Sequence, residues 1–188
     1  MKKFLLALMC LCVAVTFTAC STEHSVKTET KFSVSTKNLQ ELLDDGDKNI
    51  KAGKYDDAIK NFNDAIEMDD QLIEPYNGRA SAYFFKGDFD KAIADFNKAI
   101  ELDPKYGEAY SNRGQCYAEK NENAKAMADF NKAIELNPNY DQVYVNRGAI
   151  YYNTGEKEKA IADFKKALEL NPNNENAKYN LQVATANQ

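Results

Sequence analysis

The apolar residues of this chain follow a helical spacing through most of its length. In one stretch, apolar side chains fall at i, i+4 and i+7: Tyr76, Ala80 and Tyr83. The next stretch repeats that spacing: Ala92, Phe96 and Ala99. This period places each set on one face of an α-helix. Gly87, between the sets, can take the positive φ that closes a helix, and Pro104 marks where the second helix cannot continue. The pattern predicts two amphipathic helices joined by a tight turn.

This two-helix pattern recurs every 34 residues. The same residue types return at matching positions: Ala58, Ala92, Ala126 and Ala160; Phe62, Phe96, Phe130 and Phe164; Pro104, Pro138 and Pro172. Self-similarity at one fixed period indicates stacked repeats, in which each helix pair covers the apolar side of its neighbour. Asn121 stands where the other repeats have the turn Gly. Asn takes the left-handed backbone conformation more readily than most side chains, so we expect the turn there as well.

The repeated positions resemble the pattern of the tetratricopeptide repeat family. Small residues stand at the eighth and twentieth positions, aromatic residues at the fourth, eleventh and twenty-fourth, and Pro at the thirty-second. The resemblance implies an all-α fold, a right-handed superhelical solenoid of four helix-turn-helix repeats closed by a polar capping helix. The implied repeats are 39–72, 73–106, 107–140 and 141–174, and the cap is 175–188. Asp45, Asn49 and Asp70 depart from the pattern in repeat one, which suits a solvent-facing terminal repeat.

A second apolar pattern precedes the repeats. Lys2 and Lys3 lead into an unbroken run of twelve apolar residues, 4–15, which is too short to span a bilayer as a helix. We interpret residues 1–19 as a signal peptide. Its end, Phe17-Thr18-Ala19-Cys20, resembles the lipobox of bacterial lipoproteins, which implies cleavage before Cys20 and lipidation of that residue, palmitate included. A plain secretory peptide cleaved near Ala19 is the alternative.

Residues 20–38 are rich in Ser, Thr and Lys and lack a helical apolar period, so we expect a flexible tether after the lipidated cysteine. By resemblance, Ser21 in place of Asp after Cys20 favours the bacterial outer membrane. The expected localisation is therefore lipid-anchored, on the periplasmic or the outer surface.

Composition narrows the function classes. The 188 residues carry a formal net charge of −5, which argues against a nucleic-acid binder. One His and four Cys leave little material for metal or nucleophile chemistry, and Cys10 and Cys12 would leave with the signal peptide. Cys116 occupies the position of Ala82 and Ile150 in sister repeats, so we expect a buried small hydrophobe there.

Asp45, Asp47, Asn49 and Asp56 have the spacing of calcium-loop ligands, but Ile50 stands where that loop needs Gly. We therefore expect no metal site there. The sequence also lacks paired Ser and His, a Gly-rich phosphate loop and an H-E-x-x-H motif. These observations predict a protein that is not an enzyme and needs no cofactor.

In the family that the chain resembles, the first helices of the repeats line a concave groove that binds peptides or partner helices. The implied groove residues are Leu43, Asn77, Ser81, Phe84, Phe85, Ser111, Gln115, Val145 and Tyr152, with Asp47, Ile50, Ala118, Ala149 and Asn153 beside them. Packing of Phe84 and Tyr152 between helices is an equal alternative. The family's carboxylate clamp needs Lys, Asn, Lys and Arg at positions that here hold Leu43, Asp47, Glu108 and Asn112, so clamp function is not supported.

The repeats also carry a recurring pair of opposite charges. Arg79, Arg113 and Arg147 stand at the seventh position, and Asp95, Asp129 and Asp163 stand sixteen residues later. In repeat one both members change, to Asp45 and Asn61. Because a charge on a packed helix face is costly unless it is paired, we predict structural ion pairs between the two helices of a repeat. The rival interpretation is an arginine ladder for an acidic ligand.

The leading expectation is a non-enzymatic adaptor or scaffold, anchored to the bacterial envelope through Cys20, whose partners are envelope proteins or peptides. The alternative is a carbohydrate-binding lipoprotein in which Phe84, Phe85 and Tyr152 stack on sugars.

Overall fold

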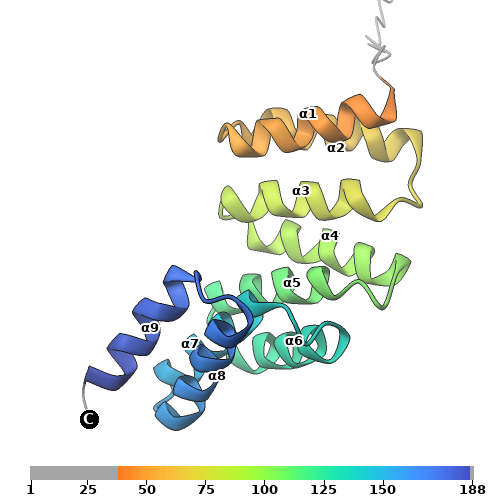
Figure 1. Ribbon diagram of the computed structural model, residues 1–188. Helices are drawn as coiled ribbons and strands as arrows, with labels where there is room; N and C mark the ends of the chain where they lie inside the picture. The colour runs from red at the N-terminus through yellow and green to blue at the C-terminus, as the bar shows by residue number, and fades with distance from the viewer. Residues whose placement is uncertain (1–37, 187–188) are drawn as a thin grey trace, which may run out of the picture. The chain divides into compact units, whose positions relative to one another are not determined.

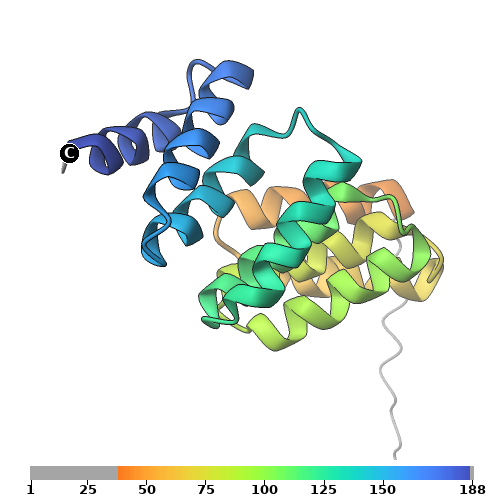
Figure 2. The ribbon, with the colours of Figure 1, turned by 90° about the horizontal axis from the view of Figure 1, so that it is seen from below.

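The computed structural model describes residues 38–186, and the regular secondary structure of this part of the chain is all α-helical. The helices are α1 (Leu39–Lys51), α2 (Tyr55–Met68), α3 (Ile73–Phe85), α4 (Phe89–Leu102), α5 (Gly107–Glu119), α6 (Asn123–Leu136), α7 (Asp141–Asn153), α8 (Lys157–Leu170) and α9 (Glu175–Ala186). Successive helices pack in chain order into a solenoid (Figures 1 and 2). The predicted all-α repeat fold is confirmed. The signal peptide, Cys20 and the tether lie outside the described residues.

The turns between paired helices use the left-handed backbone that the sequence indicates. Gly53, Gly87 and Gly155 have φ of 71°, 79° and 83°, and Asn121 has φ of 60°. Each turn directs the second helix back along the first, so the two helices of a repeat pack antiparallel.

The recurring Phe of each second helix forms the centre of its repeat. Phe62, Phe96, Phe130 and Phe164 are all at most 1% exposed. A Cβ built on Gly114 would lie 2.7 Å from Phe130 Cε1, and one on Gly148 would lie 2.7 Å from Phe164 Cε1. The small eighth position therefore makes room for the phenyl ring between the two helices.

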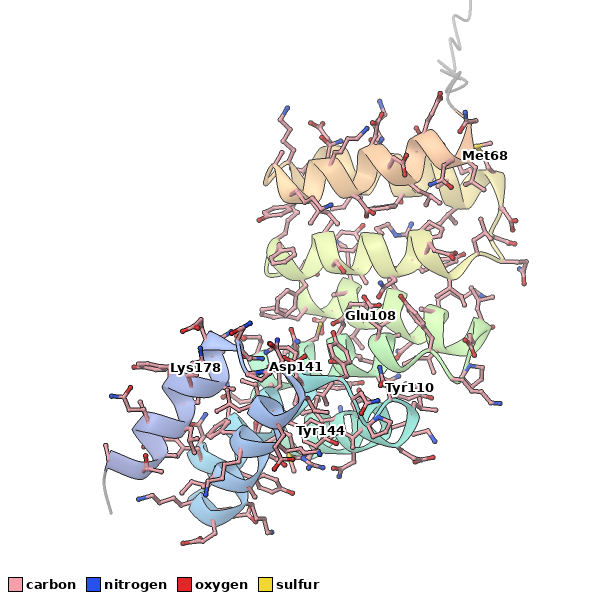
Figure 3. All side chains as sticks on the ribbon, viewed as in Figure 1. Met68, Glu108, Tyr110, Asp141, Tyr144 and Lys178 are labelled. Carbon is pink, nitrogen blue, oxygen red and sulfur yellow. The ribbon has the colours of Figure 1, made fainter. Side chains whose placement is uncertain are left out.

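Tyrosines on the first helices of repeats two to four tie each of these repeats to the loop before it. Tyr144 Oη donates to the Pro138 carbonyl at 3.1 Å, and Tyr110 Oη donates to the Pro104 carbonyl at 3.4 Å (Figure 3). These bonds supply donors to loop carbonyls that lie beyond the ends of the preceding helices.

Helix α9 closes the stack. It buries Ala177 beside Tyr144 and Ala184 beside Phe164, whereas Tyr179 on its outer side is 67% exposed. Asn174 caps the helix by accepting from Ala177 N at 2.9 Å and holds Asp141 through its Nδ2 at 2.7 Å. The polar cap is thus locked to the start of α7.

Within residues 38–186, no helix is both long enough and apolar enough to cross a bilayer.

Candidate binding groove

Two adjoining hollows lie along the first helices of repeats two to four. The smaller, which we call the phenylalanine pocket, has a volume of about 160 Å³ and is lined by Ser81, Phe84, Phe85, Phe96, Asn112 and Gln115. The larger, which we call the amide pocket, has a volume of about 710 Å³. Gln115 lines both, so the two pockets are neighbours, and together their linings extend from α3 to α7.

The amide pocket takes its name from carboxamide side chains: Gln115, Asn121, Asn123, Asn146 and Asn153. Its apolar lining includes Phe130 and Ile150, and Glu119 brings a carboxylate. Amides both donate and accept hydrogen bonds, so this lining suits a ligand that carries peptide groups.

Several predicted groove residues meet in these pockets. Ser81, Phe84, Phe85 and Gln115 line the phenylalanine pocket. Ala118, Ala149 and Asn153 line the amide pocket. Asn121, Asn123 and Asn146 were not predicted from the sequence as pocket residues. Asn121 and Asn123 lie at the turn between α5 and α6, and Asn146 lies on the first helix α7, so their repeat positions could have indicated them.

The prediction that Ser111 and Val145 line the groove is wrong, because the structure leaves them 0% and 3% exposed. Both occupy the fifth position of a first helix, where the next helices cover the side chain. Val145 packs with Tyr144, Ala167 and Ala177.

The other implied groove residues take part in packing. Leu43 and Ile50 pack on the Phe62 cluster, and Tyr152 packs on the Phe164 cluster. Asn77 is half-buried and donates through Nδ2 to Glu108 Oε1 at 3.3 Å, where α5 faces α3 (Figure 3). Asp47 is exposed on α1, the helix of the calcium-like motif. Asp45, Asp47 and Asn49 all lie within helix α1, where Asp47 is on a different face from Asp45 and Asn49, so these residues do not form a ligand loop.

Each recurring arginine is held in an ion pair. Arg113 donates to Asp129 through Nε at 2.8 Å and through Nη2 at 2.7 Å, and Asp129 is 6% exposed. Arg79 with Asp95 and Arg147 with Asp163 repeat this bidentate arrangement. The hydrogen bonds to the aspartates are the main cause that raises the pKa of each arginine. Guanidinium groups held this way are not presented as a ladder for an acidic ligand.

Sequence reasoning missed the third member of each cluster. Arg79, Arg113 and Arg147 each donate Nη1 to an Asn on the second helix of the preceding repeat, namely Asn63, Asn97 and Asn131. The 34-residue spacing of these asparagines was the available signal.

Lysines near the turns are also paired across repeats. Lys86 pairs with Asp56, and Lys120 pairs with Asp90 and, at 3.4 Å, with Glu122. These cations are therefore engaged by carboxylates.

Cys116 is fully buried, as the sequence predicts. Burial raises the pKa of its thiol to about 12, so the thiol stays protonated and unreactive at neutral pH. No cluster of three potential metal ligands exists among residues 38–186.

Comparison with known proteins gives consistent matches. Two family models, both described as tetratricopeptide repeat, match residues 77–141 and 142–174. The chain is 31% identical to MamA in a crystal structure, with 71% of this chain and 78% of that one covered and a TM-score of 0.64. It is also 31% identical to the first TPR of Spaghetti (RPAP3) bound to the HSP90 peptide SRMEEVD, over 63% of this chain and 94% of that one, with a TM-score of 0.60. A thermophilic TPR protein of Thermus thermophilus is 21% identical over 80% and 82% of the two chains, with a TM-score of 0.72, and supports the fold alone.

Proposed function

The chain belongs to the tetratricopeptide repeat family, and we propose that it is a non-enzymatic scaffold that binds a segment of another protein in the phenylalanine and amide pockets. The observation that carries this proposal is that the two pockets are neighbours and share Gln115 as a lining residue. Two neighbouring hollows along three repeats suit an extended chain better than a compact ligand.

Binding of a partner at the two pockets can be tested by photo-crosslinking in cells. A photoreactive amino acid in place of Phe85 or Asn153 stands at the pocket rim, because both residues are exposed and line the pockets. Matched probes replace Tyr179 and Glu158, which are exposed on α9 and α8. We expect discrete adducts only from the two rim positions. Equal adducts from all four positions, or none from the rim, would contradict the proposal.

The envelope location is the second part of the proposal. The apolar run at 4–15 and the sequence ending at Cys20 support a lipid anchor, with protein partners in the bacterial envelope and the outer membrane as the site. Labelling with an alkyne fatty acid should mark the wild-type protein, and Cys20→Ser should abolish the label. An unlabelled wild-type protein would exclude the anchor and leave the pockets as proposed.

The peptide of the RPAP3 complex, SRMEEVD, is acidic. At the clamp positions this chain has Leu43, Asp47, Glu108 and Asn112. Three of these side chains are acidic or apolar where a carboxylate clamp needs cations and an amide, so we propose a different class of peptide partner.

A further inference from the structure

The phenylalanine pocket has the size and walls of a site for one apolar side chain. Its volume of about 160 Å³ is close to the ~150 Å³ of an apolar cavity that accommodates benzene. The wall is built from two consecutive aromatic residues, since the rings of Phe84 and Phe85 meet edge-on at 5.6 Å. Phe96, which is 1% exposed, supplies the apolar floor.

Packing from outside the pocket holds this wall in place. The ring of Phe85 stacks on Tyr55 with centroids 5.6 Å apart, and Phe84 lies 5.6 Å from Phe89. Phe85 nevertheless remains 56% exposed at the pocket mouth. A rigid, half-open aromatic residue beside an apolar pocket is the feature that an incoming side chain would cover.

The amide pocket offers exposed carboxamides to a ligand. Asn121 and Asn153 line the pocket and are exposed. A carboxamide both donates and accepts hydrogen bonds, so these side chains can pair with the N–H and C=O groups of a peptide. The pocket therefore matches the backbone of an extended segment.

Charge selects among such segments. Glu119 is the one charged side chain that lines either pocket in the described structure. Lys86 and Lys120, which follow the lining residues Phe85 and Glu119 in the chain, are paired with Asp56 and Asp90. An acidic segment would meet an uncompensated carboxylate here, whereas a Lys or Arg would meet a partner.

From these features, and resting on the function proposed above, we infer that the pockets bind an extended peptide segment with one apolar side chain and a nearby Lys or Arg. The apolar side chain occupies the phenylalanine pocket, the segment's backbone pairs with the amides, and its cation lies beside Glu119.

The test is a selection with linear dodecapeptides displayed on phage, with the purified full chain immobilised through a C-terminal tag. We expect the enriched peptides to combine a large apolar residue with Lys or Arg and to be depleted of Asp and Glu. For the best peptide, measured by fluorescence anisotropy, we expect Glu119→Lys to weaken binding roughly fivefold to tenfold and Phe85→Ala roughly tenfold.

Matched controls are Glu158→Lys on α8 and Tyr179→Ala on α9, which should leave the affinity unchanged. Circular dichroism checks that each variant is folded, and Gln115→Ala offers a second pocket variant if Phe85→Ala is destabilised. Enrichment of acidic peptides, or binding indifferent to Glu119 and Phe85, overturns this inference and leaves the proposed scaffold function standing. Failure to enrich any peptide, together with no crosslink at Asn153, overturns both.

Discussion

Arg113 Nη1 lies 2.6 Å from Asn97 Oδ1, so a guanidinium on α5 is bonded to the second helix of the preceding repeat. The same guanidinium is held by Asp129 of its own repeat. One side chain therefore joins three helices, and the arrangement recurs at Arg79 and Arg147. This geometry explains why a charge can stand on a packed helix face: its donors are bonded on both sides of the repeat junction.

Removal of Arg113 should destabilise the protein. We expect Arg113→Ala to lower the free energy of unfolding by about 1 to 3 kcal/mol, because Asp129 is left buried with fewer partners. Asp129→Ala should cost a similar amount, and the double variant should cost less than the sum. Urea denaturation of all four proteins measures this coupling. Strict additivity would show that the pair is not one unit.

The asparagine of the cluster should have a smaller effect. Asn97→Ala removes one acceptor at the rim of the cluster, so we expect a loss of about 0.5 to 1.5 kcal/mol. Lys165 is the matched control, because it holds the same repeat position as Asn97 while Leu181 stands where the next Arg would be. Lys165→Ala should change the stability by less than about 0.5 kcal/mol. Equal losses at the two sites would mean that the inter-repeat bond contributes nothing.

The turn at Asn121 gives a backbone prediction. At φ of 60°, Asn121→Ala should destabilise by about 1 kcal/mol, whereas Asn121→Gly should match or exceed the wild-type stability. Asn176→Ala is the control, since Asn176 is exposed within helix α9. There the better helix propensity of Ala should make the change neutral or slightly stabilising. Thermal unfolding of the three variants reports the order, and an Ala variant as stable as the Gly variant would contradict it.

Cys116 should resist alkylation in the folded protein. Its thiol has a pKa raised by burial to about 12, so iodoacetamide at pH 8 should modify it only after unfolding in urea. An unfolded thiol ionises at about pH 8.5, so ionisation favours the unfolded state above that pH. The contribution of Cys116 to stability should thus be intact at neutral pH and decline as the pH rises toward 12. Mass spectrometry that finds rapid modification of the native protein would disprove this burial.

Much of the fold could be predicted because residues with the same packing and turn requirements recur every 34 residues. The first helices begin at Leu39, Ile73, Gly107 and Asp141, which are the first residues of the expected repeats, and Glu175 begins the cap. The site was harder to predict. Ser111 and Val145 share a face with groove positions, and the repeat pattern alone does not show that the following helices cover these two positions.

The Asn partners illustrate the same limit. The Arg and Asp of one repeat vary together in the sequence, so their pairing could be inferred. The hydrogen bond between Arg113 and Asn97 joins two repeats. Which residue contacts the arginine depends on how far apart the stacked helices lie. The pocket amides depend in the same way on the spacing of α5 and α7.

The arginine clusters also have a consequence for how this chain can change its length. Each interior junction uses the same Asn, Arg and Asp at the same positions, so excision of residues 73–106 would bring Asn63 into register with Arg113. A duplication of one interior unit would equally create a junction with all three members. Loss of the first repeat would make repeat two terminal, with Arg79 at the position where repeat one has Asp45. Loss of the last repeat would make repeat three terminal, with Asn131 at the position where repeat four has Lys165. The interior of the array is interchangeable, whereas its two ends are specialised.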